Sequence, residues 1–442
     1  MKVLLFNPGW DGRVSRKGRR INRRWPPLDL LNCAALLERE GMEASIIDAR
    51  ARPVEPEELA RVSPGYDRIF VTSSPLDRWQ CPNLEFDLFL AGLQPLRHGE
   101  LYVMGAHGTR YPEIVLERTG AKAVIRGEPE WAVLDICRGR RLPEIPGISY
   151  REARGVVSTP DRAPADLTRL PVPAFHLVDL AGYGYELLGE RLAVLETTRG
   201  CPFPCAFCLR DMYGGKTYRK KTPEQVGREV ANAIEAAGAR CGYFIDLEFS
   251  LDKDFTRQVC AELKPFARRW RWCCQTRADC VDAGLLKAMK EAGCALVHFG
   301  VETGSPRIMR QIGKGLELEQ IEKGVSLAKD AGLEVACFFM FGFPDETDLD
   351  REMTLRFAER LEPTYASFHA VTPYPGTPLS AGSGQDLYPD SLLTGDRREE
   401  LLRWQRAAYR RHYLRLGFAL SLLRRFDAGR LARQARLAWD LF

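Results

Sequence analysis

Short β-rich apolar runs alternate along the first 138 residues with longer stretches in which apolar residues recur at helical spacing. Leu28–Arg39 is one such predicted helix, preceded by Pro26-Pro27 and followed by Gly41. The alternation predicts an α/β fold with a doubly wound parallel sheet, of the Rossmann-like kind, whose ligands bind beyond the carboxyl ends of the strands. The predicted strands are Val3–Phe6, Ala44–Ile47, Ile69–Thr72, Leu101–Met104 and Ala123–Ile125.

The same rhythm resumes at residue 191 and continues to about residue 380. Six β-rich runs alternate there with helical patterns, which predicts a partial (β/α)6 barrel of the TIM type. In such barrels the chemistry gathers at the carboxyl ends of the strands. The predicted strands are Leu192–Thr197, Tyr243–Ile245, Trp270–Gln275, Leu296–Gly300, Val335–Met340 and Ser367–Val371.

Two further regions complete the predicted organisation. Residues 139–190 are rich in proline and charge, and we expect a linker with a small hairpin around Gly155. Residues 381–442 are expected to form a helical, basic C-terminal region, with twelve arginines against five acidic residues from position 396 onwards. Apolar residues at helical spacing favour a cap on the barrel, and contact with a membrane surface or an anionic partner is the alternative.

Composition narrows the class of protein without identifying it. The 442 residues are 45% hydrophobic and 28% charged, and the net charge of +5 does not indicate nucleic-acid binding. No run of eighteen apolar residues predicts a membrane span, and the N-terminal residues do not resemble a signal peptide. With thirteen cysteines, these features favour a reducing compartment, and we expect a cytoplasmic protein.

Three cysteines directly follow the first predicted barrel strand, at Cys201, Cys205 and Cys208. Three thiolates on one tight loop suit a [4Fe–4S] cluster and leave one of its four irons open to a substrate or cosubstrate. The alternatives are a zinc site or buried cysteines. Zinc usually takes four ligands, often from two separated pairs, and this sequence has no second pair at CxxC spacing.

The spacing C-x3-C-x2-C, with the aromatic Phe207 before the last cysteine, resembles the signature of the radical S-adenosylmethionine (SAM) enzymes. The resemblance implies that the open iron chelates SAM and that an electron from the cluster cleaves it to methionine and a 5′-deoxyadenosyl radical. It also implies an external electron donor such as a flavodoxin or ferredoxin, and a small-molecule substrate.

In this family the later barrel strands end in residues that hold SAM. Asp246 and Glu248 stand where many members have Gly-Gly-Glu, from which this sequence departs. Arg277 could bind the SAM carboxylate as a fork, or could instead form an exposed ion pair. The stretches Gly300-Val-Glu302-Thr-Gly304 and Phe341-Gly342-Phe-Pro344 resemble the family's ribose and adenine sides, although either could be a simple strand-ending turn.

The loops at the ligand edge of the first domain resemble the cobalamin-binding domain that precedes the radical SAM domain in one large subclass. The signature Asp-x-His-x-x-Gly is absent, so we expect no histidine from that motif on the lower face of cobalamin. A sheet that binds no corrin and only braces the barrel is the alternative. The basic loop 11–24 is either solvated or closes over an anionic group. Candidate corrin-lining residues are Asn7, Ser73, Ser74, Gly105 and His107, and an Arg126-Gly-Glu128 turn follows.

The other cysteines are read first as core residues. Cys241, Cys273, Cys274, Cys294 and Cys337 lie in or beside predicted buried strands. Cys33, Cys81 and Cys137 could instead hold a second cluster, as in methylthiotransferases, although their local sequences do not resemble that group.

The sequence therefore predicts a cobalamin-dependent radical SAM enzyme with a [4Fe–4S] cluster, SAM and cobalamin as cofactors. The predicted reaction is methyl transfer to an unactivated carbon of a small molecule or natural-product intermediate. Radical cyclisation or rearrangement on the same frame is the alternative. An RNA-modifying enzyme is less favoured, because no RNA-binding module is recognisable after residue 380.

Overall fold

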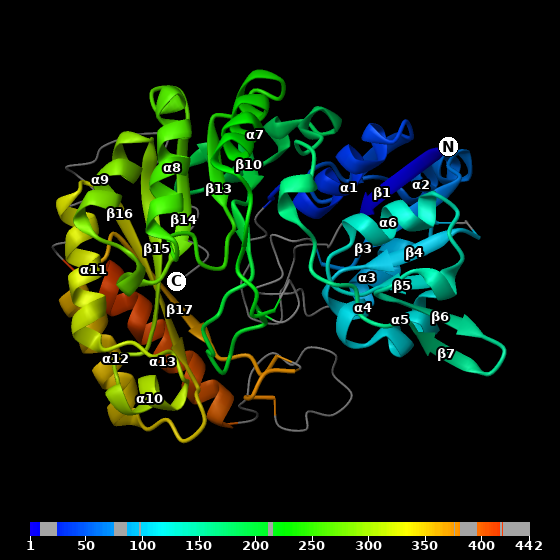
Figure 1. Ribbon diagram of the computed structural model, residues 1–442. Coiled ribbons are helices and arrows are strands. Elements are labelled where there is room, and N and C mark those ends of the chain that lie inside the picture. Colours follow the sequence, from blue (N-terminus) through cyan, green and yellow to red (C-terminus); the bar gives the residue numbers. More distant parts are fainter. Residues whose placement is uncertain are drawn as a thin grey trace.

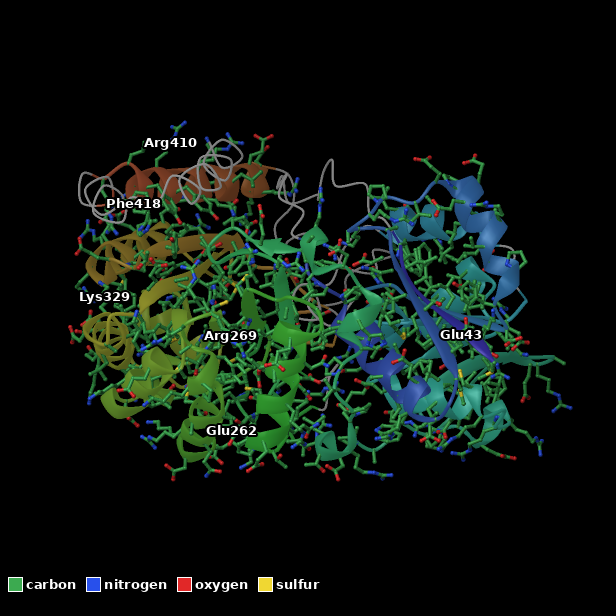
Figure 2. All side chains as sticks on the ribbon, turned by 90° about the horizontal axis from the view of Figure 1, so that it is seen from above. Glu43, Glu262, Arg269, Lys329, Arg410 and Phe418 are labelled. Atoms are coloured by element: carbon green, nitrogen blue, oxygen red, sulfur yellow. The ribbon has the colours of Figure 1, made fainter. Side chains whose placement is uncertain are left out.

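A computed structural model describes residues 1–8, 24–74, 86–96, 99–210, 215–374, 376–380, 396–415 and 418. The chain forms two α/β domains that lie side by side (Figure 1), and the perpendicular view of Figure 2 shows the same arrangement. Most of the basic loop 11–24, Cys81 and nearly all of the tail after residue 415 lie outside the described residues.

The first domain contains a seven-stranded sheet in the order β2-β1-β3-β4-β5-β6-β7. Strands β1 to β5 are parallel, which confirms the doubly wound sheet, and the strand order reverses between β1 and β3. Ligands of such sheets bind at this reversal, beyond the carboxyl ends of the two strands. The elements are β1 (Lys2–Asn7), α1 (Leu28–Arg39), β2 (Glu43–Asp48), α2 (Pro56–Val62), β3 (Arg68–Thr72), α3 (Phe86–Leu93), β4 (Leu101–Met104), α4 (Ala106–Arg110), α5 (Pro112–Thr119), β5 (Ala123–Ile125), α6 (Glu130–Cys137), β6 (Ile148–Glu152) and β7 (Gly155–Ser158).

The small hairpin has a different place from the one expected. The sequence predicts it within the linker, but β6 pairs antiparallel with β5 and thereby extends the first sheet at its edge. Val124 stands opposite Ser149 in this pairing. The strand pattern of the hairpin was readable from the sequence, whereas its pairing partner was not, because pairing is a long-range contact.

Strand β1 shows why both faces of this sheet are apolar. Val3 and Leu5 pack with α1 and α6 on one side, while Leu4 and Phe6 pack with α3 and α5 on the other. All four side chains are at most 2% exposed. Helices on both faces are what a parallel sheet requires, since successive side chains point to opposite sides.

The second domain is the predicted partial barrel. Its six strands are all parallel and neighbour one another in chain order, β10-β13-β14-β15-β16-β17. In Figure 1 the helices that follow these strands lie on the outside of the curved sheet. The elements are β10 (Leu192–Leu195), β11 (Thr198–Arg199), β12 (Arg219–Lys220), α7 (Pro223–Glu235), β13 (Cys241–Phe244), α8 (Lys253–Leu263), β14 (Arg271–Thr276), α9 (Ala283–Glu291), β15 (Cys294–Glu302), α10 (Pro306–Gln311), α11 (Leu318–Asp330), β16 (Glu334–Phe341), α12 (Asp348–Leu361) and β17 (Tyr365–Ala370), with β8 (Gly184–Tyr185) and β9 (Gly189–Glu190) in the linker.

Helix α13 (Asp396–Tyr413) covers the open edge of β17. The Tyr413 hydroxyl accepts from the Ala366 amide at 3.1 Å and donates to the Ala366 carbonyl at 2.8 Å, and Tyr409 contacts Phe368 in the same way. These side chains satisfy edge groups that would otherwise be unpaired. Within its described part, the C-terminal region is therefore a helical cap on the barrel. None of the described helices is long and apolar enough to span a bilayer.

Candidate active site

The three signature cysteines, Cys201, Cys205 and Cys208, lie on a loop that leaves the barrel at the carboxyl end of its first strand. Beyond β10, strands β11 and β12 pair antiparallel, so the residues between them project as one loop. Gly200 opens this loop at φ 88°, a left-handed value that favours glycine, and the Cys201 amide donates to the Gly215 carbonyl at 3.2 Å. The loop is therefore closed at its base, directly beside the first cysteine.

The outer part of the loop is held against the end of α10. The Ala206 amide donates to the Ile312 carbonyl at 2.9 Å, and the Cys208 amide donates to the Cys205 carbonyl at 3.2 Å. All three signature cysteines are partly exposed, whereas the other described cysteines are buried. The structure thus separates three accessible thiols on one loop from the cysteines of the core.

Burial and neighbouring charges both act on the pKa values of the three signature cysteines. Burial raises the pKa of Cys201 to about 11 and that of Cys208 to about 12, and it also raises the pKa of Cys205. The nearby cations Lys314 and Arg277 lower the pKa of Cys205, whereas the Glu302 carboxylate raises it further. Without metal the thiols hold their protons, so binding of iron would have to release them.

Among the residues described, no three His, Cys, Asp or Glu side chains converge closely enough to hold a single metal ion. A cubane cluster does not require that convergence, because each of its cysteine ligands binds a different iron. Three accessible thiols on one closed loop fit such a cluster. The nearby cations fit it as well, because cluster-bound thiolates carry negative charge.

Arg277, at the end of β14, lies beneath this loop. Its guanidinium stacks 3.7 Å from the centre of the Phe203 ring, forms an ion pair with Asp279 at 2.9 Å and donates to the Lys314 carbonyl at 2.7 Å. The side chain is 8% exposed, so the alternative of an exposed ion pair is wrong. Most of its donors already have partners, which suits a residue that supports the cluster loop.

Glu302 ends β15 and is paired with a residue that the sequence analysis missed. The Lys314 ammonium lies 2.6 Å from its carboxylate, and the two side chains are only 5% and 10% exposed. Glu302 has φ 69°, and a side chain at Gly300 would collide with both the Glu302 carboxylate and the Lys314 ammonium. Lys314 stands in a Gly-Lys-Gly turn, a signal too common to single it out beforehand.

Asp246 and Glu248 are buried beside the base of the loop. The Asp246 carboxylate accepts hydrogen bonds from the amides and hydroxyls of Thr197 and Thr198, at 2.5–3.1 Å. Glu248 accepts from the Thr276 hydroxyl and from the Arg277 amide, the latter at 2.8 Å, and burial raises its pKa to about 7. Both carboxylates thus join the ends of neighbouring strands at the rim of the barrel.

The fifth strand ends in a turn that is tied to the loop. The Gly342 amide, at φ 94°, donates to the Glu346 carboxylate at 2.6 Å. The Phe207 ring lies edge-on to the Phe343 ring, with centroids 6.3 Å apart. The aromatic residue of the cysteine signature therefore contacts the turn that resembles the adenine side.

The first domain presents buried polar groups at its ligand edge. The Asn7 side-chain amide donates to Asp48 at 2.9 Å, but its Oδ1 atom is buried and has no hydrogen-bond partner among the described residues. The same holds for the hydroxyls of Ser73 and Ser74. Asn7 is the last residue of β1, and Ser73 and Ser74 directly follow β3, on either side of the point where the strand order reverses. Buried oxygens of this kind fit a polar ligand such as a corrin.

Gly105 and His107 lie against the same edge. A side chain at Gly105, which has φ 101°, would approach the Ser74 amide to 2.8 Å. His107 is fully buried, and its ring lies 5.0 Å from that of Phe86. The structure therefore brings the described candidates of this edge together in one place.

The expectation of core cysteines is confirmed for Cys241, Cys273, Cys274, Cys294 and Cys337, all at most 2% exposed. Cys33 and Cys137 are also buried, on α1 and α6, and Cys81 lies outside the described residues, so a second cluster is not tested.

Comparison with known proteins identifies the family to which the chain belongs. The family model of the radical SAM superfamily matches residues 195–358. An uncharacterized methyltransferase of Pyrococcus horikoshii is 32% identical over 391 residues, which cover 86% of this chain and 82% of the relative. An anaerobic magnesium-protoporphyrin IX monomethyl ester cyclase of Rubrivivax gelatinosus is 26% identical, covering 86% of this chain and 69% of the relative.

Among solved structures, the radical SAM methyltransferase TsrM of Kitasatospora setae, with cobalamin and a [4Fe–4S] cluster bound, has the same fold. Its TM-score is 0.68 at 19% identity, over 86% of this chain and 73% of TsrM. The cysteine loop at the end of the first barrel strand, the matched family model and the extended similarity to the Pyrococcus protein agree, and the chain belongs to the radical SAM superfamily.

Proposed function

We propose that this protein is a cobalamin-dependent radical SAM methyltransferase that acts on an unactivated carbon of a small molecule. The proposal rests on one observation: the edge of the first sheet where ligands are expected lies next to the edge of the barrel that carries the three cysteines. The cysteine loop follows β10, the buried oxygens of Ser73 and Ser74 follow β3, and ion pairs across the junction join the ends of β5 and β10. The similarity to a methyltransferase over 86% of the chain supports the reaction class.

In this proposal Cys201, Cys205 and Cys208 hold the cluster, and the rim of the barrel holds SAM. The Glu302 carboxylate would accept hydrogen bonds from the ammonium or ribose hydroxyls of SAM, and the Lys314 ammonium, 2.6 Å away, would hold that carboxylate in place. Gly300 and Gly342 let the ligand approach the backbone closely. Phe207 packs on the adenine side, Arg277 supports the loop, and Asp246 and Glu248 remain candidates for the methionyl end.

In the first domain, Asn7, Ser73 and Ser74 would bind the corrin, and Gly105 and His107 would line the same edge of the sheet. When bound, the cluster supplies the electron that cleaves SAM, and cobalamin supplies the methyl group. The protein contributes position and the exclusion of water.

A labelling experiment tests the reaction class. The reconstituted protein is incubated under reducing conditions with cell extract of its source and SAM that carries a deuterated methyl group. Methyl transfer predicts a small-molecule product that contains the labelled group, together with 5′-deoxyadenosine. Products that form with 5′-deoxyadenosine but without label would contradict methyl transfer.

Radical cyclisation is the second candidate, because the Rubrivivax relative is a cyclase and the similarity extends over 86% of this chain. Cyclisation predicts an unlabelled product in the experiment above. For either reaction we propose that a flavodoxin or ferredoxin supplies electrons at the exposed part of the cysteine loop, where Pro202 and Pro204 are exposed.

A further inference from the structure

A group of buried charges lies at the junction of the two domains. Among the described residues it contains three carboxylates and two cations, whose side chains are all at most 12% exposed. Carboxylates from the first domain contact cations from the second, and a backbone group of the linker joins them, since the Ala165 carbonyl accepts from Arg219 at 2.6 Å. The junction network, as we call it, comprises Glu128, Glu130, Glu196, Arg199 and Arg219.

Arg199 is the centre of the junction network. Its guanidinium lies 2.7 Å from Glu196 in its own domain, and 2.5 Å from Glu130 and 3.2 Å from Glu128 in the first domain. Asn32 on α1 completes the contact, with its amide 3.5 Å from Glu130 and 3.4 Å from Glu196. One planar fork thus holds three carboxylates from two domains in a fixed geometry.

The two ends of this contact lie at the two cofactor edges. Arg199 is separated from Cys201 only by Gly200, at the base of the cysteine loop. Glu128 and Glu130 lie just beyond the carboxyl end of β5, at the edge that carries Ser73 and Gly105. The junction network therefore joins the backbone that would hold the cluster to the backbone that would hold the corrin.

Stability alone does not explain such a network. Buried ion pairs lose their hydration, and well-packed apolar residues in their place are often equally stable. Charge pairs with rigid, bidentate geometry do, however, specify one arrangement of the parts they join. A reaction between groups carried by two domains depends on such an arrangement, because a misplacement of about 1 Å can reduce a rate by about 100-fold.

We propose that Arg199, with Glu130, Glu128 and Glu196, is a positioning residue that fixes the cobalt of the corrin relative to SAM on the cluster. The proposal rests on the proposed function. It distinguishes two events: cleavage of SAM to 5′-deoxyadenosine needs the barrel alone, whereas transfer of the SAM methyl group to reduced cobalamin needs both domains in register. In that transfer the carbon–sulfur bond breaks, cobalt(I) supplies the electron pair of the new bond, and S-adenosylhomocysteine leaves.

Two isosteric variants of the full-length holoenzyme separate positioning from folding. Glu130→Gln weakens a pair that crosses the junction. Glu229→Gln changes an equally buried carboxylate whose partner Lys221, 2.8 Å away, belongs to the same domain. With titanium(III) citrate as reductant, we measure 5′-deoxyadenosine and methylated cobalamin. We expect Glu130→Gln to lower the ratio of methylated cobalamin to 5′-deoxyadenosine about tenfold or more, and Glu229→Gln to leave it unchanged.

Hydrogen exchange provides a readout that needs no cofactor. In the unloaded protein, Glu130→Gln is expected to speed exchange at residues 128–133 and 197–201, and Glu229→Gln is not. If Glu130→Gln does not fold, Arg199→Lys replaces it, since lysine keeps the charge but cannot form the fork.

Equal product ratios and equal exchange in the crossing and control variants would overturn the proposal. A wild-type protein that binds no cobalt or methylates none would count against the proposed function instead. In that case the exchange experiment still decides whether the network holds the domains together.

Discussion

Replacement of Gly200 by alanine tests how the cysteine loop is held. Gly200 has φ 88°, and an added Cβ would lie 2.8 Å from the carbonyl carbon of Thr217 and still closer to its oxygen. Both atoms belong to the backbone and cannot rotate away. The loop would have to move at the residue that directly precedes Cys201.

The expected cost has two parts, and the chain offers a control that separates them. A left-handed conformation costs a non-glycine residue about 1–2 kcal/mol. Gly41 has φ 75° with nothing within 4 Å of an added Cβ, so Gly41→Ala carries this part alone. Crowding at Gly200 adds about 1–3 kcal/mol. The gain from a stiffer unfolded chain is common to both variants and cancels in their difference.

Chemical denaturation and iron analysis after anaerobic reconstitution measure the two consequences. Gly200→Ala should unfold at a lower denaturant concentration than Gly41→Ala, by about 1–3 kcal/mol, and should hold much less iron than wild type. Gly41→Ala should hold as much iron as wild type. Equal stability of the two variants together with full iron content in Gly200→Ala would refute the reasoning about the loop.

Three further predictions follow from single sites. Cys205→Ala should abolish cluster assembly and SAM cleavage, while Cys337→Ala, in the core, should lower stability and leave the iron content unchanged. Iron analysis of both variants checks this prediction, and a full iron content in Cys205→Ala would count against the site. Lys314→Met should destabilise the fold by about 3–5 kcal/mol, because it leaves the Glu302 carboxylate buried and unpaired, and the double variant with Glu302→Gln should recover much of the loss in denaturation curves. Burial raises the pKa of Glu229 from 4.5 to about 7, so the folded protein binds this proton more tightly than the unfolded chain, and wild type loses stability as pH rises from about 4.5 to about 7. Glu229→Gln should therefore gain stability relative to wild type across that pH range, by up to about 3 kcal/mol. A difference in unfolding free energy that does not change with pH would contradict the shift.

Local patterns were sufficient for much of the fold. The Leu28–Arg39 helix has the bounds that its apolar spacing and flanking Pro and Gly predict. The alternation of strands and helices gave both parallel sheets, because each strand and helix is a local signal. The cysteine spacing indicated the loop and its chemistry for the same reason, since its three cysteines lie within eight residues.

Long-range partners could not be predicted in the same way. Nothing near Arg199 in the sequence indicates that it contacts Glu130, 69 residues earlier. Lys314 reaches Glu302 only because the turn after α10 folds back over the end of β15. The stacking of Arg277 on Phe203 likewise depends on how the cysteine loop packs.

Metal analysis of the reconstituted protein tests the central claim most directly. The protein is purified without oxygen, supplied with iron, sulfide and hydroxocobalamin, desalted, and analysed for iron and cobalt together with its absorbance spectrum. The account predicts about four irons per chain for a single cubane, and cobalt equimolar with protein. Iron without cobalt would contradict the cobalamin site and leave a radical SAM enzyme whose first domain serves the substrate or the fold.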